Sequence, residues 1–160
     1  WAYPNLLYLL DSLGRGHGLF WNTFQNCGQP FLANQQVALF YPFNALWLLH
    51  RIDAVMIALY GIHLVVAGAG MYWLGRVLGL RPAAALCGAL LFQLSAITLW
   101  LGYWYYVILA VYAWIPAALA ATERVLKGPS LGYVAALALI LAMQLLAGHA
   151  QILVFEGLGK

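Results

Sequence analysis

Long apolar stretches separated by short turns dominate the chain. A helix crosses the roughly 30 Å hydrocarbon core of a bilayer with about 20 apolar residues. Stretches of this kind lie at residues 54–75, 83–101, 104–122 and 131–155. Gly148 interrupts the last of them, which is therefore either one tilted span or a span followed by the start of another. The pattern predicts an all-α fold, a polytopic transmembrane helix bundle.

The first 53 residues follow a different pattern. Residues 1–10 and 37–50 are apolar and rich in aromatics but too short to span a bilayer, which favours helices that lie in the interface. Amides and turn-forming residues dominate between them, at residues 25–36. We therefore expect residues 1–53 to form one large extracytoplasmic loop that contains short interfacial helices.

The few charged residues predict the orientation of the helices. Lys and Arg in short loops prefer the cytoplasmic side. The turns after residues 75 and 122 are charged and contain Arg76, Arg81, Glu123, Arg124 and Lys127. The turn at Gly102–Tyr103 has no charge. Residues 1–53, this uncharged turn and residues 148–151 are therefore expected on the extracytoplasmic side.

Composition restricts the class of protein. Hydrophobic residues make up 66% of the 160 residues and charged residues 7%, whereas a soluble domain is about 45–50% apolar and about 25% charged. These proportions exclude a water-soluble globule and a disordered chain. The net charge is +3, but the basic residues form no patch, so we expect membrane lipid as a partner and no nucleic acid.

Cysteine and histidine placement excludes two further classes. Cys27 and Cys87 are expected on opposite sides of the membrane, so no disulfide is predicted. No Cys or His stands at ligand spacing, so no metal site is predicted, and the sequence leaves open whether a cofactor is used.

Within the predicted spans, several residues indicate packing rather than chemistry. Gly61, Gly68 and Gly75 recur every seven residues, a spacing that lets another backbone approach closely. His63 lies near mid-membrane, where an interhelical hydrogen bond is favoured over a proton or substrate contact. Pro116 removes an amide donor, and we expect a kink there.

Polar side chains on the expected outer side form the candidate site. Amides and aromatics at a wet membrane surface are suited to bind sugars or polar headgroups; the alternative is a solvated loop whose amides satisfy its own backbone. These side chains are Trp21, Asn22, Asn34, Gln35, Gln36 and Tyr41. Asp11 has the chemistry of a base or metal ligand, while Arg15 and Arg51 suit a phosphate.

The segment around His149 and Gln151 is expected on the same side. Counted from Leu131 at about 1.5 Å per residue, these side chains lie roughly 27–30 Å along the helix, which reaches the outer interface. A histidine there is suited to bind a phosphate or to shuttle a proton. The alternative is that His149 caps the end of the helix.

Three motifs resemble the outer loop of the YfhO-type bacterial membrane proteins. They are residues 18–22 (GLFWN), 28–36 (GQPFLANQQ) and 40–44 (FYPFN). His63, residues 114–116 (WIP) and residues 146–151 (LAGHAQ) follow in the family's order. The resemblance covers nearly the whole chain.

This resemblance implies a place in the GT-C group of polytopic glycosyltransferases. Members typically transfer a sugar from a polyprenyl-phosphate carrier to an acceptor on the outer face of the membrane. YfhO-type proteins are associated with glycosylation of cell-envelope polymers such as teichoic acids. The resemblance thus implies a polyprenyl-phosphate-linked sugar as partner and a place in the bacterial cytoplasmic membrane. The alternative is a non-catalytic membrane scaffold or carrier of the same architecture.

The candidate residues then take roles from the resemblance. Asp11 and His149 are the catalytic candidates, although the group's catalytic Asp generally stands nearer the first transmembrane helix than Asp11 does. The substrate-binding candidates are Arg15, Trp21, Asn22, Asn34, Gln35, Gln36, Tyr41, Arg51 and Gln151. The chain starts without Met and residues 156–160 follow an apolar run, so we expect a piece of a longer protein that is inactive in isolation.

Overall fold

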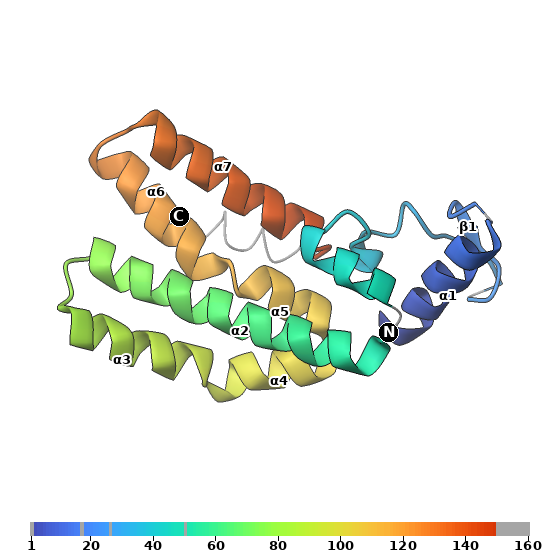
Figure 1. Cartoon of the computed structure of the whole chain (residues 1–160). Coiled ribbons are helices and arrows are strands. Elements are labelled where there is room, and N and C mark those ends of the chain that lie inside the picture. Colours follow the sequence, from blue (N-terminus) through green and yellow to red (C-terminus); the bar gives the residue numbers. More distant parts are fainter. Residues whose placement is uncertain (1, 17, 26, 50, 150–160) are drawn as a thin grey trace.

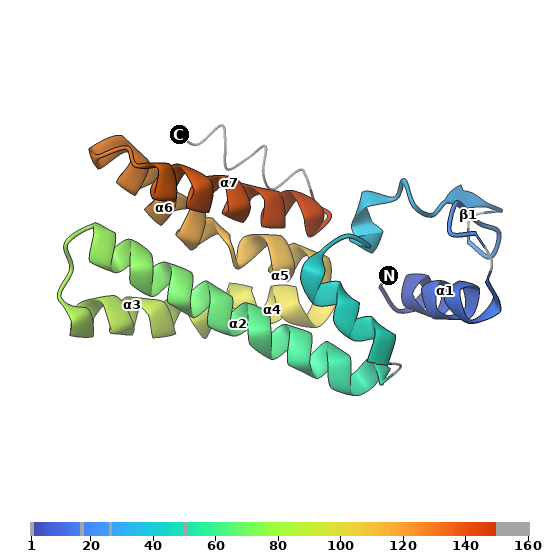
Figure 2. The same cartoon turned by 45° about the horizontal axis from the view of Figure 1, so that its top comes forward.

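The computed structural model describes residues 2–16, 18–25, 27–49 and 51–149. The described chain is helical apart from loops and one short two-stranded ribbon, which confirms the all-α prediction. The long apolar helices run side by side as a bundle, and the N-terminal region packs at one end of it (Figure 1). The turned view in Figure 2 shows the same arrangement.

Three helical segments among the described residues are long and apolar enough to cross a membrane. The first is α2 (Ile52–Val77), the second comprises α3 (Pro82–Gln93) and α4 (Ala96–Trp104), and the third comprises α5 (Tyr106–Tyr112) and α6 (Ile115–Lys127). Helix α7 (Leu131–Leu146) is apolar but shorter, and part of the stretch 131–155 lies outside the described residues.

Two of the spans are broken, each for a local reason. Ser95 separates α3 from α4, and its hydroxyl accepts a hydrogen bond from the amide of Thr98, which starts a new helix. Helix α5 ends at Tyr112, the residue whose carbonyl the missing amide of Pro116 would have served. The kink expected at Pro116 is therefore confirmed as a break, whereas the break at Ser95 was not predicted.

The turn predicted at Gly102–Tyr103 is wrong. Helix α4 continues to Trp104, and Tyr105 separates it from α5. Gly102 stays helical and lies against the ring of Tyr60 on α2, which leaves no room for a Cβ atom. This glycine serves a close helix contact instead of a turn.

Small residues bring α2 close to its neighbours α3 and α6. A Cβ atom on Gly75 would lie 3.0 Å from that of Ala85 on α3, and one on Gly70 would lie 3.0 Å from the amide nitrogen of Ala117 on α6. A Cβ atom on Gly68 would lie closer still to the side chain of Gln93. A Cβ atom on Gly61 would meet no other segment within 4 Å, so of the three predicted glycines only Gly68 and Gly75 make a close helix contact.

The N-terminal region consists of short elements. Helix α1 covers Ala2–Arg15, strands β1 (Trp21–Asn22) and β2 (Gln29–Pro30) pair antiparallel, and the 3₁₀ helices η1 (Gln35–Val37) and η2 (Pro42–Leu49) follow. The hydroxyl of Tyr8 on α1 donates to the carbonyl of Trp21 at 2.8 Å and so ties α1 to the ribbon. The ribbon was not predicted.

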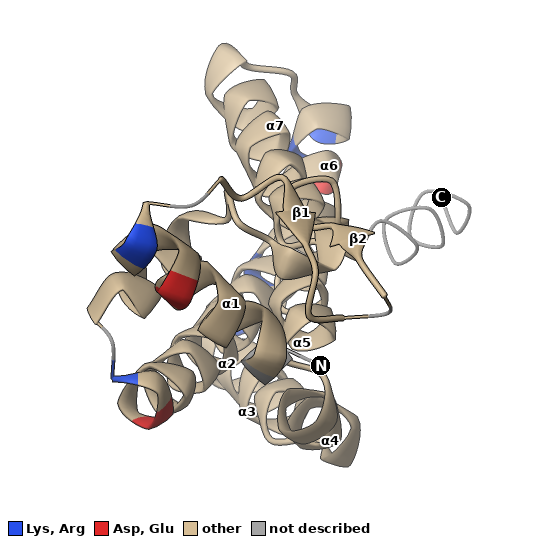
Figure 3. Ribbon diagram, turned by 90° about the vertical axis from the view of Figure 1, so that its right-hand side faces the viewer, with Lys and Arg blue, Asp and Glu red and all other residues tan. Residues whose placement is uncertain are grey.

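The two ends of the bundle differ in chemistry. At one end, which we call the charged end, basic residues exceed acidic ones: Arg76 lies in the last turn of α2, Arg81 precedes α3, and Arg124 and Lys127 lie in the last turn of α6. At the other, the aromatic end, α1, the ribbon, the start of α2, the α4–α5 junction and the end of α7 come together (Figures 1 and 3). The aromatic end is where the predicted site residues gather.

Candidate functional site

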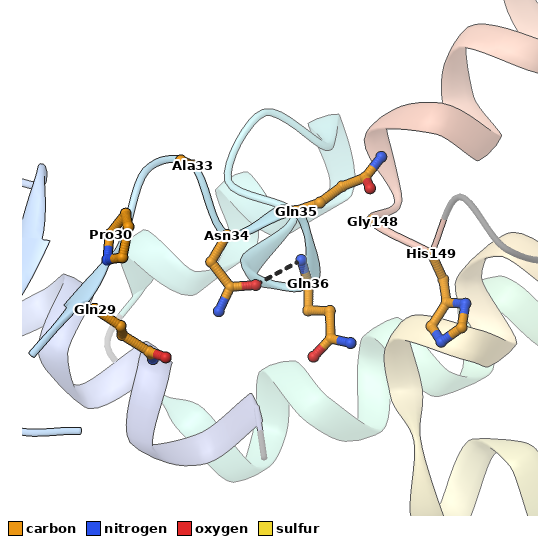
Figure 4. Close-up of a pocket in the computed structure, with 8 residues that line it drawn as sticks. All are labelled: Gln29, Pro30, Ala33, Asn34, Gln35, Gln36, Gly148 and His149. Atoms are coloured by element: carbon orange, nitrogen blue, oxygen red, sulfur yellow. Dashed lines mark hydrogen bonds between the residues drawn. The ribbon is translucent and has the colours of Figure 1, made fainter. Parts of the chain in front are cut away.

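A cavity of about 560 Å³ opens at the aromatic end, and we call it the amide cavity. Its lining combines a loop segment before residue 37 with the residues that follow α7, more than a hundred positions later. The lining residues are Gln29, Pro30, Ala33, Asn34, Gln35, Gln36, Gly148 and His149. The structure thus brings together four of the predicted site residues, namely Asn34, Gln35, Gln36 and His149 (Figure 4).

The loop wall of the amide cavity is shaped by a helix cap. The side-chain oxygen of Asn34 accepts a hydrogen bond from the amide of Gln36 at 3.1 Å and so caps η1. This bond leaves the Asn34 amide nitrogen available as a donor. Figure 4 shows the side chains of Asn34, Gln36 and His149 extending in the same direction, downward in this view, while Gln35 extends toward α7.

Gly148 joins the two halves of the amide cavity. Its φ of 94° lies in the left-handed region, the usual conformation of a glycine that ends a helix. It also lies against the carbonyl of Gln35 and leaves no room for a Cβ atom. The glycine therefore ends α7 and brings the following His149 next to the loop wall.

His149 carries an unsatisfied group. The residue is partly buried, and its Nδ1 atom is buried without a hydrogen-bond partner among the described residues. A buried nitrogen without a partner is costly, and such groups in native proteins are usually met by water or a ligand. His149 is therefore a group that a polar ligand of the amide cavity can satisfy.

Tyr41 is not a sugar contact, because it is only 1% exposed. Its hydroxyl lies 2.7 Å from Nε2 of His63 on α2, and it accepts a hydrogen bond from Nε1 of Trp114 at 3.0 Å. Nδ1 of His63 faces the carbonyl of Leu59, which only accepts, so Nδ1 carries the proton and Nε2 accepts from Tyr41. Burial raises the pKa of Tyr41 to about 12, and the bond from Trp114 opposes this shift.

The same contacts decide the role of His63. The predicted hydrogen bond exists, but the partner of Nε2 is a loop tyrosine instead of another helix. Nearby, the side chain of Asn44 donates to the carbonyl of Ala38 at 2.9 Å and accepts from the hydroxyl of Tyr106 on α5 at 3.1 Å. These bonds hold residues 34–44, and with them the loop wall of the amide cavity, on the bundle.

Asn22, another predicted substrate-binding residue, does not line the amide cavity. The residue is fully buried, and its side-chain oxygen accepts from the amide of Phe24 at 2.9 Å, which shapes the ribbon turn. Trp21 packs on Gly28, where a Cβ atom would lie 2.7 Å from the indole nitrogen. Trp21 and Asn22 therefore support the loop and do not line the amide cavity.

The predicted charged residues lie away from the amide cavity. Asp11 and Arg15 pair with each other on α1 at 2.7 Å, and Asp11 lines a separate hollow of about 290 Å³ against the ribbon. Arg51 is exposed just before α2. Gln151 lies outside the described residues. Of the two catalytic candidates, only His149 lines the amide cavity.

Gln29, Pro30 and Ala33 line the amide cavity but were not among the predicted site residues. The available signal was the run of polar and turn-forming residues at 25–30, which the apolar residues 31–33 separate from Asn34.

Comparison of the chain with protein-family models, with curated proteins and with solved structures gave no match.

Proposed function

We propose that this chain belongs to an integral membrane protein of the GT-C-like glycosyltransferase type, and that the amide cavity binds a sugar carried on polyprenyl phosphate. The acceptor is a cell-envelope polymer, and the aromatic end faces the outside of the bacterial cytoplasmic membrane. One observation supports the proposal above all. Amide side chains at residues 34–36 and an imidazole at residue 149 line one cavity at one end of three apolar helices long enough to span a membrane.

The chemistry of the lining matches a neutral polyol. Carboxamides both donate and accept hydrogen bonds, as sugar hydroxyls do. The described lining contains no Lys, Arg, Asp or Glu, so nothing in it favours a bare ion over a sugar. Among the described lining residues, His149 is the one whose side chain can gain or lose a proton near neutral pH.

In the proposed reaction, an acceptor hydroxyl attacks the anomeric carbon. The new carbon–oxygen bond forms as the bond between the anomeric carbon and the phosphate oxygen breaks, and the phosphate leaves with the electron pair. His149 accepts the proton of the attacking hydroxyl, a role suited to an imidazole near neutral pH. Asp11 lies off the cavity and takes no part in this step.

The second candidate is a non-catalytic carrier or scaffold that binds the lipid-linked sugar without transferring it. The same lining favours it, because no Lys or Arg among the described lining residues of the amide cavity stabilises a departing phosphate. Binding is common to both candidates, and transfer separates them.

The test uses the full-length protein that contains this chain, in lipid nanodiscs, with a radiolabelled hexose on polyprenyl phosphate as probe and a polyol-phosphate polymer as acceptor. Asn34→Ser keeps an oxygen that can cap η1 but removes the amide donor, so we expect about fivefold weaker binding, the value of one hydrogen bond. His149→Gln should weaken binding a few-fold and lower transfer at least 100-fold. Arg124→Gln at the charged end is the matched control and should change neither.

Wild-type binding by both Asn34→Ser and His149→Gln contradicts the proposal. Normal binding by the wild type with no release of polyprenyl phosphate favours the carrier.

A further inference from the structure

A second, smaller pocket adjoins the amide cavity. It has a volume of about 60 Å³ and is lined by residues 104–108, the junction of α4 and α5, together with Gln36 and His149. Gln36 and His149 also line the amide cavity, so the two spaces meet at these side chains. We call the smaller one the junction pocket.

The junction pocket differs from the amide cavity in chemistry and width. Its α4–α5 side is formed by aromatic and aliphatic residues, including Trp104, Tyr105 and Ile108. At about 60 Å³ against about 560 Å³, it is much the smaller space and suits part of a narrow chain better than a whole sugar. The polar and apolar parts of a ligand therefore have separate places.

The position of the junction pocket points to the membrane. It lies where two candidate spans, Pro82–Trp104 and Tyr106–Lys127, meet at their ends. Trp104 is 61% exposed and Tyr105 is 52% exposed. Exposed Trp and Tyr at the ends of apolar helices are typical of the membrane–water interface, where lipid chains begin.

We propose that the junction pocket holds the first carbons of an apolar chain whose polar head lies in the amide cavity. The inference rests on the proposed function and adds where the lipid part of the ligand lies. The ligand is an amphiphile with a narrow, isoprenoid-like chain, and it enters sideways from the membrane, passing between Gln36 and His149. A water-soluble sugar phosphate leaves the junction pocket empty.

The test compares three probes bound to the chain in nanodiscs. The first is polyprenyl-phosphate hexose, the second is the same hexose on methyl phosphate, and the third is polyprenyl phosphate without sugar. Ile108→Trp fills the junction pocket. The matched control is Ile97→Trp on α4, where the isoleucine is exposed and lines neither space.

We expect Ile108→Trp to weaken the first and third probes at least tenfold and to leave the second unchanged, while Ile97→Trp binds all three like the wild type. Trp104→Ala opens the junction pocket without overfilling it and should weaken the first and third probes about threefold. This second variant keeps the test valid if Ile108→Trp fails to fold.

Equal losses for the first and second probes in both variants, or no loss for any probe, overturn the inference. If polyprenyl phosphate binds the wild type as tightly with and without its hexose, and Ile108→Trp weakens both, the junction pocket stands and the sugar-binding proposal fails. If the wild type binds none of the probes, the sugar-binding proposal and the junction-pocket proposal are both contradicted.

Discussion

Two faces of α2 are held to the rest of the protein by different forces. Against α3 and α6, the contact is made by small residues such as Gly75, Gly70 and Ala117, which let backbones approach closely. Toward the N-terminal region, apolar packing of Trp47 against the start of α2 is joined by a chain of directed hydrogen bonds. In this chain His63 accepts from Tyr41, and Tyr41 accepts from Trp114.

This difference explains how the chain positions its cavity. Close packing between apolar helices is set by shape and has little directional preference. Hydrogen bonds require defined distances and angles, and a buried group left unpaired is costly. The spans are therefore assembled by fit, whereas the wall of the amide cavity is located by directed bonds and by the single close contact at Gly148.

Substituting Gly148 should have the largest effect, because the left-handed backbone after α7 and the close approach to the Gln35 carbonyl both depend on this glycine. Gly148→Val places a β-branched residue in a left-handed conformation, which costs roughly 1–2 kcal/mol, and forces a side chain against the Gln35 carbonyl. We expect a loss of about 3 kcal/mol or more in stability and loss of probe binding, measured by denaturation in detergent and by equilibrium binding.

Gly128→Val is the control for this experiment. Gly128 also follows a helix, α6, but its φ of −173° is extended backbone and no atom lies within 4 Å of its Cβ position. A change of about 0.5 kcal/mol or less is expected. Comparable losses in the two variants would show that the close approach at Gly148 is not what holds the loop wall.

Removing the Tyr41 hydroxyl tests the hydrogen-bonded face of α2. Tyr41→Phe leaves Nε2 of His63 and the indole N–H of Trp114 without their partner, which should cost about 1–3 kcal/mol. The control is Tyr72→Phe, whose tyrosine is exposed and has no hydrogen bond among the described residues. Denaturation at neutral pH measures the difference between the variants.

The pH dependence of the same variant sharpens the test. The pKa of Tyr41 is about 12 in the folded protein and about 10 when unfolded, so between these values the unfolded chain releases a proton that the folded chain keeps. Stability is therefore fully present below pH 10 and falls as pH rises toward 12, by up to about 2.7 kcal/mol for two pKa units. The advantage of wild type over Tyr41→Phe should shrink across this range, and a constant difference would contradict the assignment.

The sequence predicted what depends on each residue's own neighbourhood in the chain. The long apolar stretches were predicted correctly as helical segments, because the length and apolarity of one stretch are enough to identify a candidate span. The placement of His149 near the loop amides followed from the length of the last helix and the sidedness of the charges. These are properties of one segment at a time.

The errors concern contacts between distant segments. Gly102 was assigned to a turn because its partner, the ring of Tyr60, lies on another helix. Tyr41 was placed on a wet surface because its partners are 22 and 73 positions away. Asn22 was predicted to contact substrate in the amide-rich loop because nothing in its local sequence revealed that this residue is buried. Pairing across the fold decides between a binding side chain and a supporting one.

The smallest expected effect tests the packed face of α2 alone. Gly61→Ala and Gly70→Ala both replace a helix-interior glycine in α2, so both gain the same roughly 0.5–1 kcal/mol of helix propensity. At Gly61 no atom lies within 4 Å of the new Cβ, whereas at Gly70 the Ala117 amide nitrogen lies 3.0 Å away and backbone must move. We expect Gly61→Ala to be neutral or slightly stabilising and Gly70→Ala to lose about 1 kcal/mol, since overpacking typically costs 1–3 kcal/mol. Probe binding should be unchanged in both variants, because neither glycine supports the loop wall. A loss of binding in Gly70→Ala without a loss of stability would show that the two faces of α2 are not independent.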